Sequence, residues 1–272
     1  MKMKILASGS KGNSSYYETN KIRFLIDIGI SYKRVKNILE KDGFDISKID
    51  ALFITHEHSD HVSGIYTFLK RTVATIYMTK GTFDSLSSKK RGLEIKDAYN
   101  NGRIYILNKD VEKDIYKSVN LYDVQIKPQQ SFHDAAEPCN YVMINNDIKI
   151  CLITDTGYIH RKQLDDFKGA NCYVLETNHD PEILMSSDRP YPLKQRILST
   201  TGHLSNEDSM YLLTKLITEK TSLVYYAHIS DECNLFELVD ETRKQVFSNL
   251  NVSSEKIKFV FTGQFSCEVV TL

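Results

Sequence analysis

The chain alternates short apolar runs with stretches in which apolar residues recur every three or four positions. The three-and-four spacing predicts helices at 31–43, 62–69, 161–167, 205–218 and 235–249. Ser31 is placed to cap the first of these helices, and Gly43 to end it. The apolar runs predict strands at 2–7, 14–18, 21–27, 49–55, 73–78, 103–107, 119–126, 140–144, 148–153, 172–176, 223–227 and 256–261.

The order of these elements indicates a mixed α/β or α+β architecture. Hairpin-linked strands open the chain, and strand–helix–strand units follow. No Pro/Gly/Ser-rich linker, low-complexity tract or fixed-period repeat divides the 272 residues. We therefore expect one domain over residues 1–272.

The charge and the cysteines limit the class of protein. Lys plus Arg and Asp plus Glu are 35 each, so the formal charge is zero and no global basic field attracts nucleic acid. A nucleic-acid substrate would need a local basic patch. The five cysteines are scattered without CxxC pairs, which favours reduced core thiols. The apolar run after Lys4 is too short for a secretory segment, and no run reaches membrane-spanning length, so we expect a cytoplasmic protein without a membrane partner.

The sequence His56-Glu57-His58-Ser59-Asp60-His61 directly follows a predicted strand. His56 and His58 are two residues apart, so on extended backbone both imidazoles point to one side. Asp60 and His61 follow as the chain turns into the predicted 62–69 helix. Four side chains of ligand type therefore converge, and this predicts a metal site at the end of a buried strand.

Three further candidates stand after other predicted strands. His133 lies in the loop that follows 119–126, while Asp155 and His228 stand at the ends of 148–153 and 223–227. Seven ligands are too many for one ion, so we expect two divalent metal ions. The assignment is His56, His58, His133 and Asp155 for one ion, and Asp60, His61, Asp155 and His228 for the other, with Asp155 bridging. Donors without thiolates suit zinc, and the carboxylates also admit manganese or iron.

These motifs resemble the metallo-β-lactamase superfamily, in the order His-x-His-x-Asp-His, His133, Asp155 and His228. The resemblance implies an αββα sandwich of two mixed sheets flanked by helices, with the metals at one edge. The finer motifs are similar to the YycJ/WalJ-type branch, which is related to ribonuclease Z, is associated with nuclease activity on DNA and admits a homodimer. These motifs lie at 8–13, 133–138, 154–158, 176–180, 202–206 and 227–230.

Two departures from the branch affect the rim of the site. Cys233 precedes Asn234 where the branch usually has two asparagines, and Asn140 stands where a glycine is common ahead of Tyr141. Both leave the ligands intact.

The expected reaction is hydrolysis of a phosphodiester by a metal-bridging hydroxide. Asp60 and His203 are the catalytic candidates. His203 occupies the place of the ribonuclease Z histidine that contacts phosphate, which implies transition-state stabilisation and general acid catalysis. The alternative interpretation is that His203 is a structural residue in the turn before the 205–218 helix.

Other polar residues are candidates for supporting roles or substrate contact. Asp134 and Glu57 would orient ligand imidazoles, and His179 is assigned equally to support and to substrate contact. The turn with Ser10 and Asn13 either offers backbone N–H groups to a phosphate or is a plain hairpin turn. The last candidate is Asn234.

The favoured function is a metal-dependent DNA exonuclease. A phosphodiesterase for small or cyclic nucleotides is the alternative, and zero net charge fits that ligand better. The bridging Asp155 and the bare N-terminus argue against a secreted β-lactamase. The motif of His203 argues against a thioester hydrolase. The non-hydrolytic alternative is a metal-binding regulatory or redox module. Electron transfer would require a cofactor domain, which this sequence does not show.

Overall fold

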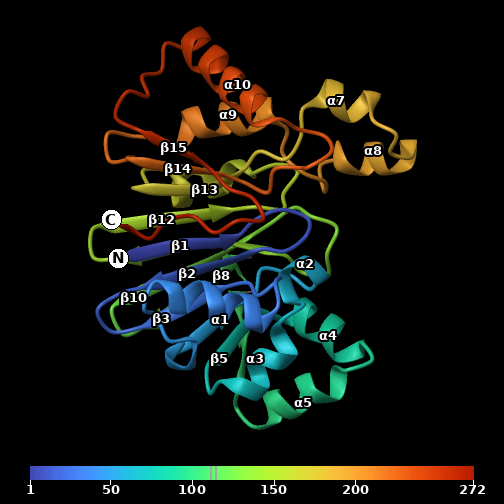
Figure 1. Ribbon diagram of the computed structural model, residues 1–272, viewed down its shortest axis with the longest axis vertical. Helices are drawn as coiled ribbons and strands as arrows, with labels where there is room; N and C mark the ends of the chain where they lie inside the picture. Colours follow the sequence, from blue (N-terminus) through green and yellow to red (C-terminus); the bar gives the residue numbers. More distant parts are fainter. Residues whose placement is uncertain (111, 114) are drawn as a thin grey trace. The chain divides into compact units, whose positions relative to one another are not determined.

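The computed structural model describes residues 1–110, 112–113 and 115–272, which form two compact units (Figure 1). The first unit comprises Met1–Gln130, Ala135–Asn146 and Gln264–Leu272. The second comprises Ser131–Asp134 and Asp147–Gly263. The expectation of one domain over 1–272 stays a prediction.

The first unit contains a seven-stranded mixed sheet in the order β16-β1-β2-β3-β4-β5-β6. The opening meander predicted from the sequence is confirmed, because β1, β2 and β3 pair antiparallel. The next three strands continue the sheet in parallel, and β16 adds antiparallel to β1. The strands are β1 (Lys2–Ala7), β2 (Ser14–Glu18), β3 (Arg23–Ile26), β4 (Ala51–Phe53), β5 (Thr75–Thr79), β6 (Ile104–Leu107) and β16 (Val270–Thr271).

Helices cover this sheet and build its core. The predicted cap is confirmed, since the Ser31 side chain accepts a hydrogen bond from Arg34 N at the start of α1. Val35 and Leu39 of α1 and Phe68 of α3 are buried in one cluster with strand residues such as Leu25 and Leu52. The helices are α1 (Tyr32–Lys41), η1 (Ile46–Lys48), α2 (Ser59–Val62), α3 (Ile65–Arg71), α4 (Lys80–Ser88) and α5 (Gly92–Asn100).

Two predicted elements of this unit are wrong in extent. The helix expected at 62–69 is divided into α2 and α3 at Gly64, whose N–H bonds to Ile28 O. A Cβ there would stand 2.6 Å from Ile30 O, so the close approach of the two segments requires glycine. The strand expected at 119–126 is a hairpin with Tyr122 at φ 53° in its turn.

The remaining strands of the first unit pair antiparallel. β10 pairs with both β9 and β11, and β7 pairs with β8. These strands are β7 (Lys109–Asp110), β8 (Ile115–Tyr116), β9 (Val119–Leu121), β10 (Val124–Gln130) and β11 (Cys139–Asn145).

The second unit contains four parallel strands joined by helical crossovers, as the sequence predicted. The strands are β12 (Ile148–Ile153), β13 (Cys172–Glu176), β14 (Leu223–Ala227) and β15 (Lys258–Phe261). The crossovers hold η2 (Arg161–Gln163), α6 (Leu164–Phe167), α7 (Pro181–Ser186), α8 (Tyr191–Ile197), α9 (Asn206–Leu216) and α10 (Phe236–Asn249). Helices α9 and α10 lie side by side (Figure 1). Because the carboxyl ends of parallel strands share one edge, residues after β12, β13 and β14 meet there.

The cysteines agree with the sequence analysis. All five are free thiols and all are buried. Among the helices of the described residues, none combines the length and apolar character needed to cross a membrane.

Candidate metal centre

The histidine motif of the first unit lies where β4 ends and α2 begins. The ring centroids of His56 and His58 are 4.5 Å apart, and those of His56 and His61 are 4.1 Å apart. His56 and His61 are buried, and His58 is the residue before α2. The structure therefore brings the three imidazoles together at the end of a buried strand.

A buried carboxylate orients this cluster. Asp27 accepts hydrogen bonds of 2.8 Å from Thr55 N and from Thr55 Oγ1, and its Oδ2 lies 2.8 Å from His61 Nδ1. An ionised carboxylate only accepts, so we assign the proton to Nδ1 of His61 and leave Nε2 as the ligand atom. Burial raises the pKa of Asp27, while His61 and Thr55 act against the rise.

The same threonine supports the first histidine. Thr55 Oγ1 donates to Asp27 and lies 3.1 Å from His56 Nδ1. Since its one proton is used, the hydroxyl accepts from His56 Nδ1, and Nε2 of His56 carries the lone pair. The sequence analysis missed Asp27 and Thr55. Asp27 offered the same signal as Asp155, an acid at the end of an apolar strand.

The turn at 8–13 holds the loop that carries Asp60. Asn13 N donates to Asp60 O at 2.7 Å, and Asn13 Nδ2 lies 3.1 Å from His61 Nε2 and 3.3 Å from Asp60 Oδ2. Gly9 N donates to Asn13 Oδ1, so these backbone groups bond within the first unit. Ser10 is exposed on the turn. The turn therefore positions a candidate ligand.

Close backbone packing makes this position depend on glycine. A Cβ on Gly29 would lie 1.6 Å from Asp60 O and 2.7 Å from Asn13 N. No side chain fits there without moving the loop. Glycine at position 29 therefore permits the close approach of the loop that carries Asp60.

The second unit contributes Asp155, Glu176, His203 and His228, whose candidate ligand atoms all lie within 4.8 Å of one another. His228 Nε2 is 3.4 Å from Asp155 Oδ1, and His203 Nδ1 is 3.9 Å from the same oxygen. Asp155 and His228 have φ of 52° and 53°. This left-handed backbone costs about 1 to 2 kcal/mol per residue outside glycine, so the surrounding structure must hold both in place.

Glu176 at the end of β13 organises that cluster. Its carboxylate accepts from His203 Nδ1 at 2.6 Å and from Thr156 N at 3.0 Å. Burial opposes its ionisation, but the charges and hydrogen bonds of His203 and His228 outweigh burial and hold the pKa of Glu176 below its ordinary value. The sequence analysis did not name Glu176 as a site residue, although it ends a buried strand as Asp155 does.

His133 stands beside this cluster. Its Nδ1 lies 3.1 Å from Gly202 O, so it donates there and leaves Nε2 as the acceptor. The ring centroid is 4.9 Å from that of His203. Asp134 lies 3.3 Å from His133 Nε2 and pairs with Arg196. Burial lowers the pKa of His133, which favours the neutral form that metals bind.

Three other candidates have different surroundings. Asn234 forms a reciprocal amide pair with Asn206, at 2.8 and 2.9 Å. Glu57 accepts from Ala136 N at 2.8 Å. His179 is 1% exposed, and among the described residues neither of its ring nitrogens has a hydrogen bond. Burial lowers the pKa of His179 to about 4.

The sequence was compared with protein families. Residues 22–229 match the model of the β-lactamase superfamily domain. The chain belongs to this superfamily. The family predicted from the sequence is confirmed. The prediction that the protein is a metal-dependent hydrolase is confirmed as well.

Curated relatives narrow the family. Exodeoxyribonuclease YycJ of Bacillus anthracis is 33% identical over 89% of this chain and 87% of its own length. Exodeoxyribonuclease WalJ of Streptococcus pneumoniae is 35% identical over 89% of this chain and 86% of its own length. The predicted YycJ/WalJ branch is therefore confirmed.

A solved structure supports the fold. Human tRNase Z, short form, aligns with a TM-score of 0.67 at 14% identity, covering 100% of this chain and 99% of that one. At this identity the likeness shows the fold alone. The predicted metallo-β-lactamase fold, with mixed sheets flanked by helices, is confirmed.

The donor groups fit the divalent metal that this family binds. Imidazoles and carboxylates are borderline to hard ligands, and no cysteine belongs to either cluster. Hydrogen bonds at Nδ1 of His56, His61 and His133 leave each Nε2 as the ligand atom. These residues therefore suit a divalent ion such as zinc.

Proposed function

We propose that this protein is a DNA exonuclease that works with two divalent ions, zinc or manganese. The observation that supports it most is the 33 to 35% identity, over 89% of the chain, to two relatives named exodeoxyribonuclease. The donor clusters supply the chemistry that a nuclease needs. The substrate is proposed to be DNA because those relatives carry that name.

The proposed ligands are those expected from the sequence. One ion takes His56, His58, His133 and Asp155, and the other takes Asp60, His61, Asp155 and His228. Three or four protein donors saturate an ion of the zinc type, so seven donors imply two ions. When bound, such ions lower the pKa of a water and stabilise charge on phosphate oxygens.

The protein's own residues prepare the proton transfers. Glu176 accepts from Nδ1 of His203, so Nε2 of His203 remains for the substrate. The His203 side chain is 18% exposed, while those of Glu176 and His228 are 0% and 4% exposed. We assign His203 to protonate the leaving oxygen, since its hydrogen bond to the buried carboxylate of Glu176 fixes the orientation of the ring. Asn13 Nδ2 donates a hydrogen bond to the carboxylate of Asp60 and so orients this proposed metal ligand.

A phosphodiesterase for small or cyclic nucleotides is the second candidate. The formal charge of zero favours it, because a small ligand needs no charged track. That the protein can form a homodimer and that it is cytoplasmic both stay predictions.

One comparison of substrates decides between these candidates. Wild-type protein with Mn²⁺ or Zn²⁺ is assayed on 5′-phosphorylated DNA, RNA, a cyclic nucleotide, a thioester and a β-lactam. We expect the highest kcat/KM on DNA, with mononucleotides released from one end. Higher kcat/KM on the cyclic nucleotide would replace the proposal by the second candidate. Preference for the thioester or the lactam would refute both.

A further inference from the structure

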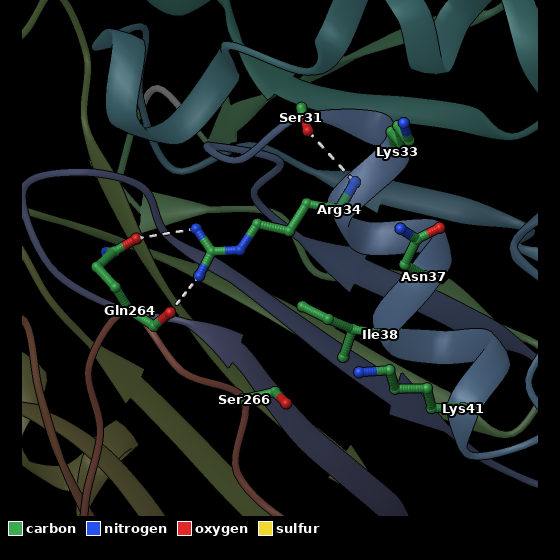
Figure 2. A pocket seen from close by; sticks show the side chains of 8 residues that line it. All are labelled: Ser31, Lys33, Arg34, Asn37, Ile38, Lys41, Gln264 and Ser266. Carbon is green, nitrogen blue, oxygen red and sulfur yellow. Dashed lines mark hydrogen bonds between the residues drawn. The ribbon is translucent and has the colours of Figure 1, made fainter.

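A cationic pocket lies between α1 and the C-terminal segment of the first unit (Figure 2). Its volume is about 420 Å³. Arg34 reaches from α1 to Gln264, and Lys41 projects from the same helix on the side of Ser266 (Figure 2). The described lining contains three cationic side chains and no carboxylate: Ser31, Lys33, Arg34, Asn37, Ile38, Lys41, Gln264 and Ser266.

The positive charge of this pocket is not neutralised within the described part of the chain. The guanidinium of Arg34 donates to Gln264 O and, at 3.2 Å, to Gln264 Oε1, and both acceptors are neutral. Lys33 and Lys41 are exposed, and neither forms an ion pair with a described carboxylate. Lys36 on the same helix differs, because it pairs with Glu40 at 3.6 Å. The pocket therefore offers its charge to an anion from outside.

Hydrogen bonds connect the pocket to the candidate ligand Asp60. Gln264 Nε2 donates to Ser8 O at 3.2 Å and to Gly12 O at 3.0 Å, at the turn 8–13. The next residue, Asn13, donates to Asp60 O at 2.7 Å. Gln264 of the pocket and the candidate ligand Asp60 are thus both hydrogen-bonded to one turn within the same unit.

The spacing of the charges suits a nucleic-acid strand. Arg34 and Lys41 are seven residues apart on α1, which places them on one face and about 10 Å apart along the helix. That length corresponds to about three phosphates of a stacked strand. Phe265, between the two lining residues of the C-terminal segment, is 52% exposed. A basic groove with an exposed aromatic ring is the usual combination for binding single strands.

We propose that this pocket binds the phosphate backbone of the DNA strand whose end is cleaved at the metal centre. The proposal rests on the proposed nuclease function. It supplies the local basic patch that a protein of zero net charge needs for nucleic acid. It also predicts that the pocket acts on long substrates and not on the chemical step.

The test compares wild type with the double variant K33Q/K41Q. The matched control is K36Q/K70Q, which also removes two positive charges, from lysines paired with Glu40 and Glu94. Binding of a long single-stranded oligonucleotide is measured by fluorescence anisotropy over a salt series, and that of a dinucleotide at one salt concentration. Turnover of the oligonucleotide and of bis(p-nitrophenyl) phosphate is measured in parallel. Arg34 is left in place because it also holds Gln264.

We expect K33Q/K41Q to bind the oligonucleotide about five-fold more weakly per lost contact at 0.1 M salt. The slope of the logarithm of the binding constant against the logarithm of the salt concentration should decrease in magnitude by about 1.4 for two lost contacts. Dinucleotide binding, turnover of bis(p-nitrophenyl) phosphate and the control should match wild type. Unchanged oligonucleotide binding, or equal weakening in the control, would overturn the proposal. Equal weakening for the dinucleotide would show a site for one phosphate instead.

The two proposals fail in different ways. If wild type binds DNA but does not cleave it, the nuclease function is refuted, and the binding comparison still decides the role of the pocket. If wild type cleaves DNA and K33Q/K41Q does so equally well at every salt concentration, only the pocket proposal is refuted. Absence of both DNA binding and cleavage in wild type would refute both.

Discussion

The substitution Asp27→Asn tests the orientation of the histidine motif within one unit. In wild type, Oδ1 accepts from Thr55 N, while Oδ2 accepts from Thr55 Oγ1 and lies 2.8 Å from His61 Nδ1. All three neighbours are donors. Asparagine keeps the shape of the side chain but replaces one accepting oxygen by an NH₂ group. At least one of these hydrogen bonds must therefore be lost.

The size of the effect follows from burial. The least costly arrangement puts the NH₂ group against Thr55 N and leaves that buried N–H unpaired, which costs about 1 to 3 kcal/mol. The remaining bond to His61 then runs to a neutral acceptor and has about half its former strength. Loss of such support for a metal ligand lowers metal affinity by about 10- to 100-fold.

The assay measures zinc affinity by competition with a chelator, together with the free energy of unfolding of the metal-free protein. Asp50→Asn is the matched control, because Asp50 Oδ2 also accepts a backbone N–H, from Arg23 at 2.8 Å, but is exposed. We expect Asp27→Asn to lower both quantities and Asp50→Asn to leave zinc affinity unchanged. Wild-type zinc affinity in Asp27→Asn would refute the assignment of the Asp27–His61 hydrogen bond.

Three further predictions concern separate features. Gly29→Ala should abolish metal binding, because its Cβ would lie 1.6 Å from a carbonyl oxygen of the ligand loop. In the control Gly43→Ala, the new Cβ meets no atom within 4 Å; its φ of 78° costs some stability, but the protein should keep its metal. His179→Leu should reduce the acid sensitivity of the metal-free protein. Folding lowers the pKa of His179 from 6.5 to about 4, so the wild type loses stability as pH falls between these values, by roughly 2 to 3 kcal/mol at the lower end. Equal unfolding curves for the wild type and His179→Leu would contradict this. His203→Ala should lower kcat by about 10²- to 10⁴-fold with metal content unchanged, whereas the exposed His160→Ala should not; normal kcat in His203→Ala would exclude its catalytic role.

Local chemistry made much of the fold predictable. The spacing of Val35 and Leu39 predicted an amphipathic helix, and both residues are buried in α1. Ser31 was predicted as a cap and accepts the expected backbone hydrogen bond. Apolar runs located most strands of both units, but not the two-residue strands β7, β8 and β16. Such features depend on neighbours in the sequence, which is why one chain suffices to predict them.

Features that depend on distant segments were not predictable. Helix 62–69 is divided at Gly64 because Ile28 and Ile30 of another segment approach its backbone. Asp27 and Glu176 support the two clusters through partners 28 and 27 residues away, Thr55 and His203. The sequence located these acids at strand ends. Only the packing of the strands shows which histidine each one orients.

The account depends most directly on two ions held by the proposed ligands. Metal content per chain, measured by mass spectrometry of the purified protein after equilibration with Zn²⁺ or Mn²⁺ and removal of free metal, tests this claim. We predict close to two ions per wild-type chain and loss of both in Asp155→Ala, since that carboxylate is the proposed bridge. One ion or none in wild type, or two ions retained in Asp155→Ala, would contradict the account.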